Sequence, residues 1–476
     1  MHPLIKRYLF TILYFLILVF SLFTDWYRFL VFALIISLVI MTIDKIGKGI
    51  VLRETIALHS CFVCLFMPLM GYMVYTKNEA LAMLWVRYMP INETAYFSYA
   101  LPAMAGFVFT LNLPIKGVND EGVSIRKLLD KAIKTLTVSP SGGVTIVLIG
   151  LATFFMSSFL DDSIQFAILL FYFASFAGIL YVYFTPKVVY KKPIFFLFVG
   201  FIVWNALSSG MFTIIAYMGI TIFSFLFLKR KILLWKKLTF FIVTLFFVFF
   251  LQSVKQSYRK EIWRSQYEGS KAVLFYNLIV DKIANTSTFF SSEAFFPIYY
   301  RTNQGYNVAL VMRRFPNIQP FDGGENIMLA LASSVVPRIL WPKKPEAGGK
   351  FNMKYYAGVT LRGWSTNISP LGEAYGAFGP GGAIIYISLL GLLIRWAYGL
   401  VFIVARKTPL ILFWLPFLFY QITYSFETDT LQITNSLIKS AFFMFILYRF
   451  LPYWFGRKVT GAEINQLTLE QKALNE

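Results

Sequence analysis

Histidine and cysteine are scarce in this chain of 476 residues, which contains two of each. Both histidines, His2 and His59, precede a long polar block at residues 252–380, so that block contains no histidine for catalysis. Cys61 and Cys64 lie within an apolar run, where thiols usually pack in the interior, and two cysteines provide no disulfide framework. The sequence also lacks internal repeats, phosphate-binding glycine loops and the DxD and HExxH patterns, so we expect no metal and no cofactor.

Charged residues are also few. Asp, Glu, Lys and Arg make up 14% of the chain, whereas hydrophobic residues make up 58% and aromatic residues 19%. Soluble domains average about 25% charged residues. The apolar runs are continuous over roughly 17–22 residues, which suits membrane-spanning helices and excludes the alternating strands of a membrane β-barrel. We therefore expect an all-α polytopic membrane protein.

Windows of about 20 residues predict about twelve transmembrane helices. They lie near residues 8–24, 29–43, 55–75, 94–113, 143–160, 163–184, 193–209, 211–228, 238–254, 381–401, 408–425 and 437–455. The chain then divides into an N-terminal membrane part with helices 1–9 (1–254), an extracytoplasmic catalytic loop with short or re-entrant helices (255–380), a C-terminal membrane part with helices 10–12 (381–455) and a cytoplasmic tail (456–476).

Lysine and arginine gather on alternate connections between the predicted helices. One set of connections contains five basic residues at 116–134 and five at 229–237, whereas the opposite short turns contain only Arg28, Lys77 and Arg87. Cytoplasmic connections are rich in Lys and Arg. We therefore expect a multi-pass protein of the bacterial cytoplasmic membrane, with both termini in the cytoplasm and the long loop outside. The net charge of +21 is mainly this topological signal and does not indicate nucleic-acid binding.

The long loop is basic in spite of this bias, because residues 252–380 contain fifteen Lys or Arg and eight Asp or Glu. Arg and Lys at a membrane face bind anionic groups, and the phosphates or pyrophosphates of a lipid lie at that depth. Attraction to lipid headgroups, or ordinary solvation, is the alternative for each cation. The candidates for substrate binding are Arg301, Arg313, Arg314, Arg338, Lys343, Lys344 and Arg362.

The segment VPRILWPKKP holds three of these cations on a stiff backbone. Residues 326–340 have the pattern of an amphipathic or re-entrant helix that Pro337 kinks and the next two prolines end. A guanidinium held in place loses little entropy when it binds a phosphate, so Arg338 is the first candidate for a pyrophosphate contact. A structural corner, with Trp341 anchored among headgroups, is the alternative.

The segment SPLGEAYGAFGPGG leads directly into the predicted helix 381–401 and contains one carboxylate, Glu373. Its small neighbours allow a ligand or another backbone to come close. Removal from water raises the pKa of a carboxyl group toward the range of a general base. Glu373 is therefore the candidate catalytic base. An ion pair with Arg338 or Arg362 is the alternative.

FDGGENIM, VPRILWPKKP and SPLGEAYGAFGPGG, all within residues 321–382, resemble motifs of the bacterial O-antigen polymerase (Wzy-type), or oligosaccharide repeat unit polymerase, family. The rest of the chain matches in hydropathy only. The resemblance implies a glycosyltransferase-C-like fold, with a large extracytoplasmic loop capping a membrane cavity. It also implies an enzyme that polymerises undecaprenyl-pyrophosphate-linked oligosaccharide repeat units into O-antigen, capsule or exopolysaccharide by en bloc glycosyl transfer.

The resemblance further implies site residues and partners. Arg338 and Lys344 match positions that face the pyrophosphate, and Glu373 matches the polar position of the last motif. Three arginines in the preceding stretch match more loosely: Arg301, Arg313 and Arg314. Fixed Arg and Lys would stabilise the leaving pyrophosphate, so the enzyme is expected to be metal-independent. The expected partners are the lipid-linked oligosaccharides, the bilayer, a chain-length regulator and a flippase.

Two alternatives stay open. An O-antigen ligase has a related architecture, but such ligases tend to use a histidine in the outer loop, and the loop contains none. A transporter or flippase would have charged or broken helices at the membrane midplane and symmetry between its halves. The predicted spans carry few charges and the long loop is strongly asymmetric, so both features favour the polymerase.

Overall fold

The structure is a computed structural model that describes residues 3–456. The description leaves out 76–88, 117, 119–121, 139–140, 158, 161, 187, 189, 210–220, 223, 229–231, 265–268, 285–291, 337–339, 346–347 and 363–365. In chain order the elements are α1 (Pro3–Phe23), α2 (Tyr27–Lys45), α3 (Arg53–Cys61), η1 (Phe62–Phe66), α4 (Met67–Val74), α6 (Glu93–Asn112), α7 (Gly122–Val138), α8 (Gly142–Ser157), α9 (Asp162–Phe184), α10 (Lys191–Ser209), α12 (Leu234–Arg264), α13 (Lys271–Ala284), α15 (Ser292–Thr302), α16 (Gly305–Arg314), α17 (Glu325–Val335), α18 (Lys350–Tyr355), α19 (Ser369–Ala405), η3 (Pro409–Trp414), α20 (Leu415–Phe419), η4 (Gln421–Glu427), α21 (Thr430–Phe450) and η5 (Pro452–Phe455).

All of these elements are helical, which confirms the all-α fold class for the described part of the chain. Six helices there are long and apolar enough to cross a membrane, or seven if α7 and α8, which meet at 84°, count as one bent span. A polytopic membrane protein is therefore confirmed, and the number of twelve spans is not. The six are α2, α3 to α4, α6, α19, η3 to η4, and α21.

Small residues bring α6 and α19 into close contact at the centre of this body. A Cβ atom on Gly106 would collide with Ser388, and one on Gly391 would collide with Thr110. The hydroxyl of Thr110 donates to the carbonyl oxygen of Ser388 at 2.8 Å. Helices in membranes associate through such small residues and interhelical hydrogen bonds, because lipid gives them no hydrophobic driving force. α6 thus fixes α19, which carries Glu373.

A break at Gly379 divides α19 into two segments. Gly379 has φ 68° and ψ −179°, a backbone conformation that favours glycine, and Pro380 follows it. The second segment contains the predicted span 381–401. The first segment, from Ser369 to Phe378, is also helical, although it precedes the predicted span. Glu373 therefore lies on a short helix whose direction differs from that of the membrane helix.

Other boundaries also differ from the predictions. α12 continues to Arg264, beyond the predicted end of the ninth span at residue 254. α17 ends at Val335, so the helix predicted over 326–340 stops before Pro337 instead of continuing through it. Pro337 itself lies outside the described residues. The residue before a proline avoids the helical conformation, which accounts for the early stop.

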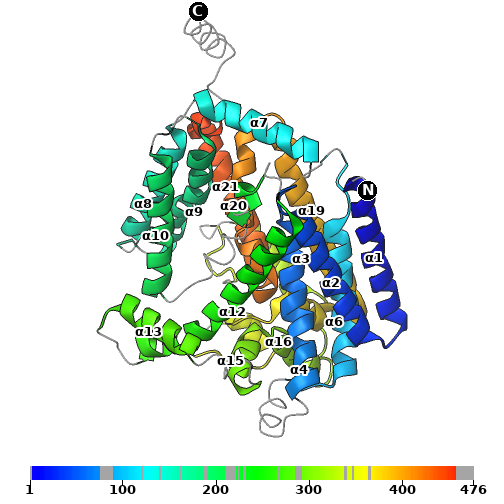
Figure 1. Cartoon of the computed structure of the whole chain (residues 1–476). Helices are drawn as coiled ribbons and strands as arrows, with labels where there is room; N and C mark the ends of the chain where they lie inside the picture. The colour runs from blue at the N-terminus through cyan, green and yellow to red at the C-terminus, as the bar shows by residue number, and fades with distance from the viewer. Residues whose placement is uncertain are drawn as a thin grey trace, which may run out of the picture.

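The two ends of the helical body carry different parts of the chain (Figure 1). α7 lies across one end, near the beginning of α1 and the end of α21, whereas α13, α15 and α16 lie at the other end. α7 buries Ile125 and Leu129 and exposes a basic face that includes Lys127 and Lys131. This arrangement separates the basic connection from the long polar block, as the predicted sidedness requires.

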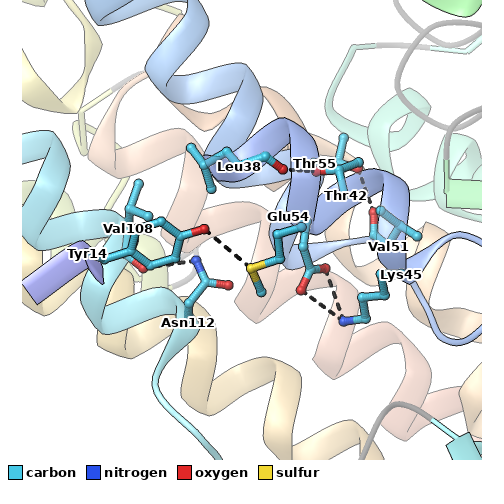
Figure 2. A network of polar contacts seen from close by, with 10 residues as sticks. Tyr14, Leu38, Thr42, Lys45, Val51, Glu54, Thr55, Val108 and Asn112 are labelled. Atoms are coloured by element: carbon cyan, nitrogen blue, oxygen red, sulfur yellow. Dashed lines mark hydrogen bonds and ion pairs between the residues drawn. The ribbon is translucent and has the colours of Figure 1, made fainter. Parts of the chain in front are cut away.

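A buried ion pair closes the hairpin between α2 and α3 (Figure 2). The Lys45 ammonium lies 3.0 and 3.1 Å from the two oxygens of Glu54, and the side chains are 2% and 0% exposed. The neighbouring Arg53 guanidinium lies over the ring of Tyr398 on α19, 4.9 Å from its centroid. Loss of one partner would leave an uncompensated buried charge, so this pair fixes the hairpin geometry. The hairpin in turn positions α3.

The first prediction concerns sidedness. Lys127→Cys on α7 and Lys354→Cys on α18 place thiols at exposed positions on the opposite ends of the body, in a background without Cys61 and Cys64. A membrane-impermeant thiol reagent should label position 354 in cells with a permeabilised outer membrane, and position 127 only after lysis, because basic connections stay in the cytoplasm. Labelling of position 127 without position 354 would contradict the predicted topology.

Candidate functional site

Glu373 is buried, at 3% exposure, and binds two distant parts of the chain. Its Oε1 accepts a hydrogen bond from Nδ2 of Asn352 on α18 at 2.9 Å. Its Oε2 accepts one from the backbone N–H of Thr430, the first residue of α21, at 2.7 Å. A carboxylate with directed donors on both oxygens is fixed in orientation. Glu373 makes these two contacts in place of the alternative ion pair with Arg362. Arg338, the other possible partner in that alternative, lies outside the described residues.

A second carboxyl group, Asp429, lies beside it in the turn before α21 and is 1% exposed. Its Oδ1 accepts from the N–H of Gln432 at 2.6 Å and so caps α21, and its Oδ2 accepts from Nδ2 of Asn367 at 2.6 Å. Burial raises the pKa of Asp429, and these hydrogen bonds oppose the rise. Glu373 and Asp429 also repel each other electrostatically. This carboxyl pair therefore holds one proton more readily than two separate carboxylates would.

Asparagine side chains surround the carboxyl pair. Nδ2 of Asn307 on α16 donates to the Asn367 carbonyl oxygen at 2.8 Å and also contacts Thr366 Oγ1 at 3.1 Å. Oδ1 of Asn367 accepts from the N–H of Ile368 at 2.9 Å. The next residue, Ser369, has φ 69°, which is rare for a residue other than glycine. Such strain persists where the surroundings enforce it, and it is common at functional sites.

Asp322 is the centre of a second network, which adjoins Glu373 through Tyr356. It accepts from Tyr356 Oη at 2.6 Å, Asn326 Nδ2 at 2.8 Å and the Gly324 N–H at 2.8 Å. Burial and the Asp322 carboxylate raise the pKa of Tyr356, so this hydroxyl stays protonated and donates. These contacts hold the loop before α17 against α18.

A third polar contact at this junction comes from α3. Nε2 of His59 lies 3.0 Å from Oε1 of Glu427, the last residue of η4. On η1, the Cys64 thiol makes a hydrogen bond with Ser369, one turn before Glu373. The sequence predictions missed His59, Glu427 and Asp429. The available signal was the FETDT segment, which places two acids between two apolar spans.

The predicted cations lie in different environments. Arg301, Arg313, Lys343 and Arg362 are exposed. Arg314 is half-buried and donates through Nε to Gln319 Oε1 at 3.2 Å.

Lys344 is engaged at the carboxyl end of α17. Its Nζ donates to the carbonyl oxygens of Ser333 at 2.8 Å and Val336 at 2.9 Å. Helix ends leave such carbonyls without partners, and a cation there is favourable. This contact brings Lys344 back to the end of α17. Lys344 thus has a structural function that the sequence prediction did not include.

Comparisons of the chain with models of protein families, with characterised proteins and with solved structures find no match.

The second prediction uses the raised pKa of Asp429. A raised value means that the folded chain binds this proton more tightly than the unfolded chain, whose Asp has a pKa of about 3.9. The resulting contribution to stability is complete below the unfolded pKa of about 3.9. It is lost as the pH rises through the raised pKa of Asp429 in the folded chain. Asp429→Asn removes the titration and retains a capping side chain. The melting temperature of the variant should therefore fall less than that of the wild type as the pH rises from about 4 to about 8.

The measurement is thermal unfolding of the purified full chain in detergent at several pH values. Glu325→Gln is the control, since Glu325 is an exposed acid at the start of α17. Equal pH dependence in Asp429→Asn and the wild type would show that Asp429 is ionised throughout.

Proposed function

We propose that this chain is a metal-independent membrane glycosyltransferase that polymerises undecaprenyl-pyrophosphate-linked oligosaccharide repeat units into a surface polysaccharide outside the cytoplasmic membrane. The observation that carries the proposal is the buried carboxyl pair Glu373 and Asp429. The pair lies where a membrane helix meets the basic polar block at residues 252–380, which we call the outer block. The motif resemblance supports the same reaction. We include in this proposal a glycosyltransferase-C-like fold with twelve spans and a cytoplasmic location for both termini.

Within the proposal, Glu373 is the general base. It takes the proton from the acceptor hydroxyl, whose oxygen forms the new bond to the anomeric carbon of the growing glycan. The bond from that carbon to the pyrophosphate breaks, and the pyrophosphate leaves with its electron pair. Asp429, whose pKa is raised by burial, shares a proton with Glu373, and Glu373 acts as the base when that proton lies on Asp429. Positioned bases contribute about 10²- to 10⁴-fold to rate.

The leaving pyrophosphate needs positive charge. Arg338 is assigned to it by the motif resemblance, and it follows the end of α17 by three residues in the chain. α17 packs against α21, whose first residue binds Glu373, so the helix that precedes Arg338 in the chain contacts the helix that begins at the carboxyl pair. Four exposed cations of the outer block supply further contacts to the substrate: Arg301, Arg313, Lys343 and Arg362.

Access to Glu373 depends on α18. Asn352 covers Oε1 of Glu373, and α18 is a short helix that begins after Gly349, which has a positive φ of 77°. Displacement of α18 would free this oxygen to accept the proton of a substrate hydroxyl, while the Thr430 N–H keeps Oε2 in place. The base would thus stay oriented during the step.

Two rival functions gain a specific observation from the structure. Ionisable residues inside the helical body, here Glu373 with Glu427 and His59, are also typical of transporters, so the low charge of the predicted spans no longer argues against that class. His59 adjoins the site although the outer block has no histidine, so the argument against a ligase is weaker too. The polymerase remains the proposal because the motifs within residues 321–382 resemble those of that family.

The third prediction separates these classes by gene deletion. Loss of a polymerase should leave single lipid-linked repeat units at the outer face of the membrane, without polymer. Loss of a flippase would leave the same units at the inner face, and loss of a ligase would leave polymer attached to the lipid carrier. Extraction of the lipid-linked glycans, with a membrane-impermeant label to report sidedness, identifies the outcome. Normal polymer in the deletion strain would overturn the proposal.

The fourth prediction concerns Glu373→Gln in the purified full chain. The amide keeps the hydrogen bond to the Thr430 N–H and removes the base, so turnover should fall by about 10²- to 10⁴-fold while binding of the lipid-linked substrate changes little. Glu325→Gln is the matched control, because it removes an exposed carboxylate from the same block. If Glu373→Gln turns over near the wild-type rate, Glu373 is not the base.

A further inference from the structure

α10 lies at the edge of the helical body and carries an open groove along one face (Figure 1). The groove has a volume of about 510 Å³. This volume lies within the range of small-molecule sites, roughly 300–1,000 Å³. The residues that line it, which define the α10 groove, all belong to α10: Pro193, Phe196, Leu197, Gly200, Phe201 and Trp204. None of them carries a charge, so the groove suits an apolar occupant.

Gly200 gives the α10 groove its depth. A Cβ atom added there would have no neighbour within 4 Å in the part of the chain that the structure describes. One wall is fixed by α8, because the ring of Phe155 lies 5.7 Å from that of Phe201 and 6.3 Å from that of Trp204. The opposite wall is open, since Leu197 is 75% exposed. A chain-like molecule can therefore enter the groove from the side.

Two lysines begin α10 immediately before the groove. Lys191 is half-buried and Lys192 is exposed. The chain contains no Asp or Glu between Asp162 and Glu261, so no acidic residue close in sequence offsets this charge. Positive charge at one end of an apolar groove is complementary to an amphiphile with an anionic head and a hydrocarbon tail.

The start of α10 lies at the end of the body that α7 covers. Tyr181 on α9 donates to the carbonyl oxygen of Trp454, just after α21, at 2.9 Å. Two residues later, the ring of Tyr183 lies 6.2 Å from that of Phe195 on α10. α7 lies near the end of α21 (Figure 1), so the lysines of α10 and the basic face of α7 share one end. The predicted sidedness makes this end cytoplasmic, where anionic headgroups attract basic residues.

The length of the α10 groove matches one leaflet of a bilayer. An α-helix rises about 16 Å from Pro193 to Trp204. Half of the hydrocarbon core of a bilayer is about 15 Å thick. With the two lysines among the headgroups, an acyl chain in the groove would therefore end near Trp204, at the bilayer centre.

We propose that the α10 groove binds one anionic phospholipid of the cytoplasmic leaflet, with its phosphate at Lys191 and Lys192 and one acyl chain along Gly200. The charge at the end of the groove selects the anionic headgroup, and the uncharged lining holds the chain. The site is separate from the carboxyl pair and adds a structural lipid to the protein.

The first test measures lipid binding to the purified full chain in detergent by native mass spectrometry. The probes are phosphatidylglycerol, which is anionic, and phosphatidylcholine, which has no net charge. The wild type should bind one phosphatidylglycerol in preference to phosphatidylcholine. Lys191→Gln combined with Lys192→Gln should weaken phosphatidylglycerol binding about tenfold and leave phosphatidylcholine binding unchanged.

Lys127→Gln combined with Lys131→Gln is the matched control, because it removes the same charge from α7 at the same end of the body. This control should retain the tightly bound phosphatidylglycerol. Equal losses in the two double variants would show that charge acts there without a groove, and would overturn the site.

The second test fills the groove. Gly200→Leu places a side chain in open space, and leucine favours a helix more than glycine does, so the variant should fold. It should weaken binding of both lipids about tenfold, because the acyl chain loses its apolar contacts. Val199→Leu is the control, since Val199 is 42% exposed on the same helix and does not line the groove. Wild-type lipid binding by Gly200→Leu would overturn the proposal.

Stability provides an independent readout. A lipid that binds only the folded chain raises its melting temperature, so phosphatidylglycerol should stabilise the wild type more than Gly200→Leu. Undecaprenyl phosphate is the competing amphiphile, and its preference over phosphatidylglycerol at the groove would overturn the choice of lipid. A dimer that Gly200→Leu dissociates, without bound lipid, would overturn it as well. None of these measurements needs turnover, so they do not depend on the proposed reaction.

Discussion

The contact of Glu373 with the Thr430 N–H is the interaction on which the site depends. It joins the short first segment of α19 to the start of α21, and the Asn352 hydrogen bond adds α18 of the outer block. Three regions far apart in the chain thus share one carboxylate, buried beside Asp429. Buried charge is costly without several donors, so the surrounding amides and backbone N–H groups are what allow two carboxyl groups to stay in the interior.

The carboxyl pair is held by a rigid frame. The glycine contacts between α6 and α19 fix the membrane helix, and the break at Gly379 turns its first segment toward the outer block. The Lys45–Glu54 pair fixes the α2–α3 hairpin at the other side of the site, and with it the position of His59. The Lys45–Glu54 pair is sealed from solvent, whereas the contact between His59 and Glu427 is partly exposed.

The outer block combines structural and exposed cations, which its composition did not distinguish. Lys344 is committed to the end of α17, and Arg314 to Gln319. Arg301, Arg313, Lys343 and Arg362 are exposed. The cations of this block therefore fall into two groups: some complete helix ends and loops, and others lie on the surface.

Hydropathy alone predicted the helical membrane class and the positions of the six spans, because an apolar run of sufficient length has no other stable fold in lipid. Glu373 was also identified from the sequence, as a lone carboxylate among small residues. Its partner Asp429, the His59–Glu427 contact and the capping function of Lys344 were not. These depend on contacts between residues far apart in the chain, such as the 57 residues from Glu373 to Thr430. Local patterns determine which segments become helices, and the packing of those helices decides which polar side chains meet.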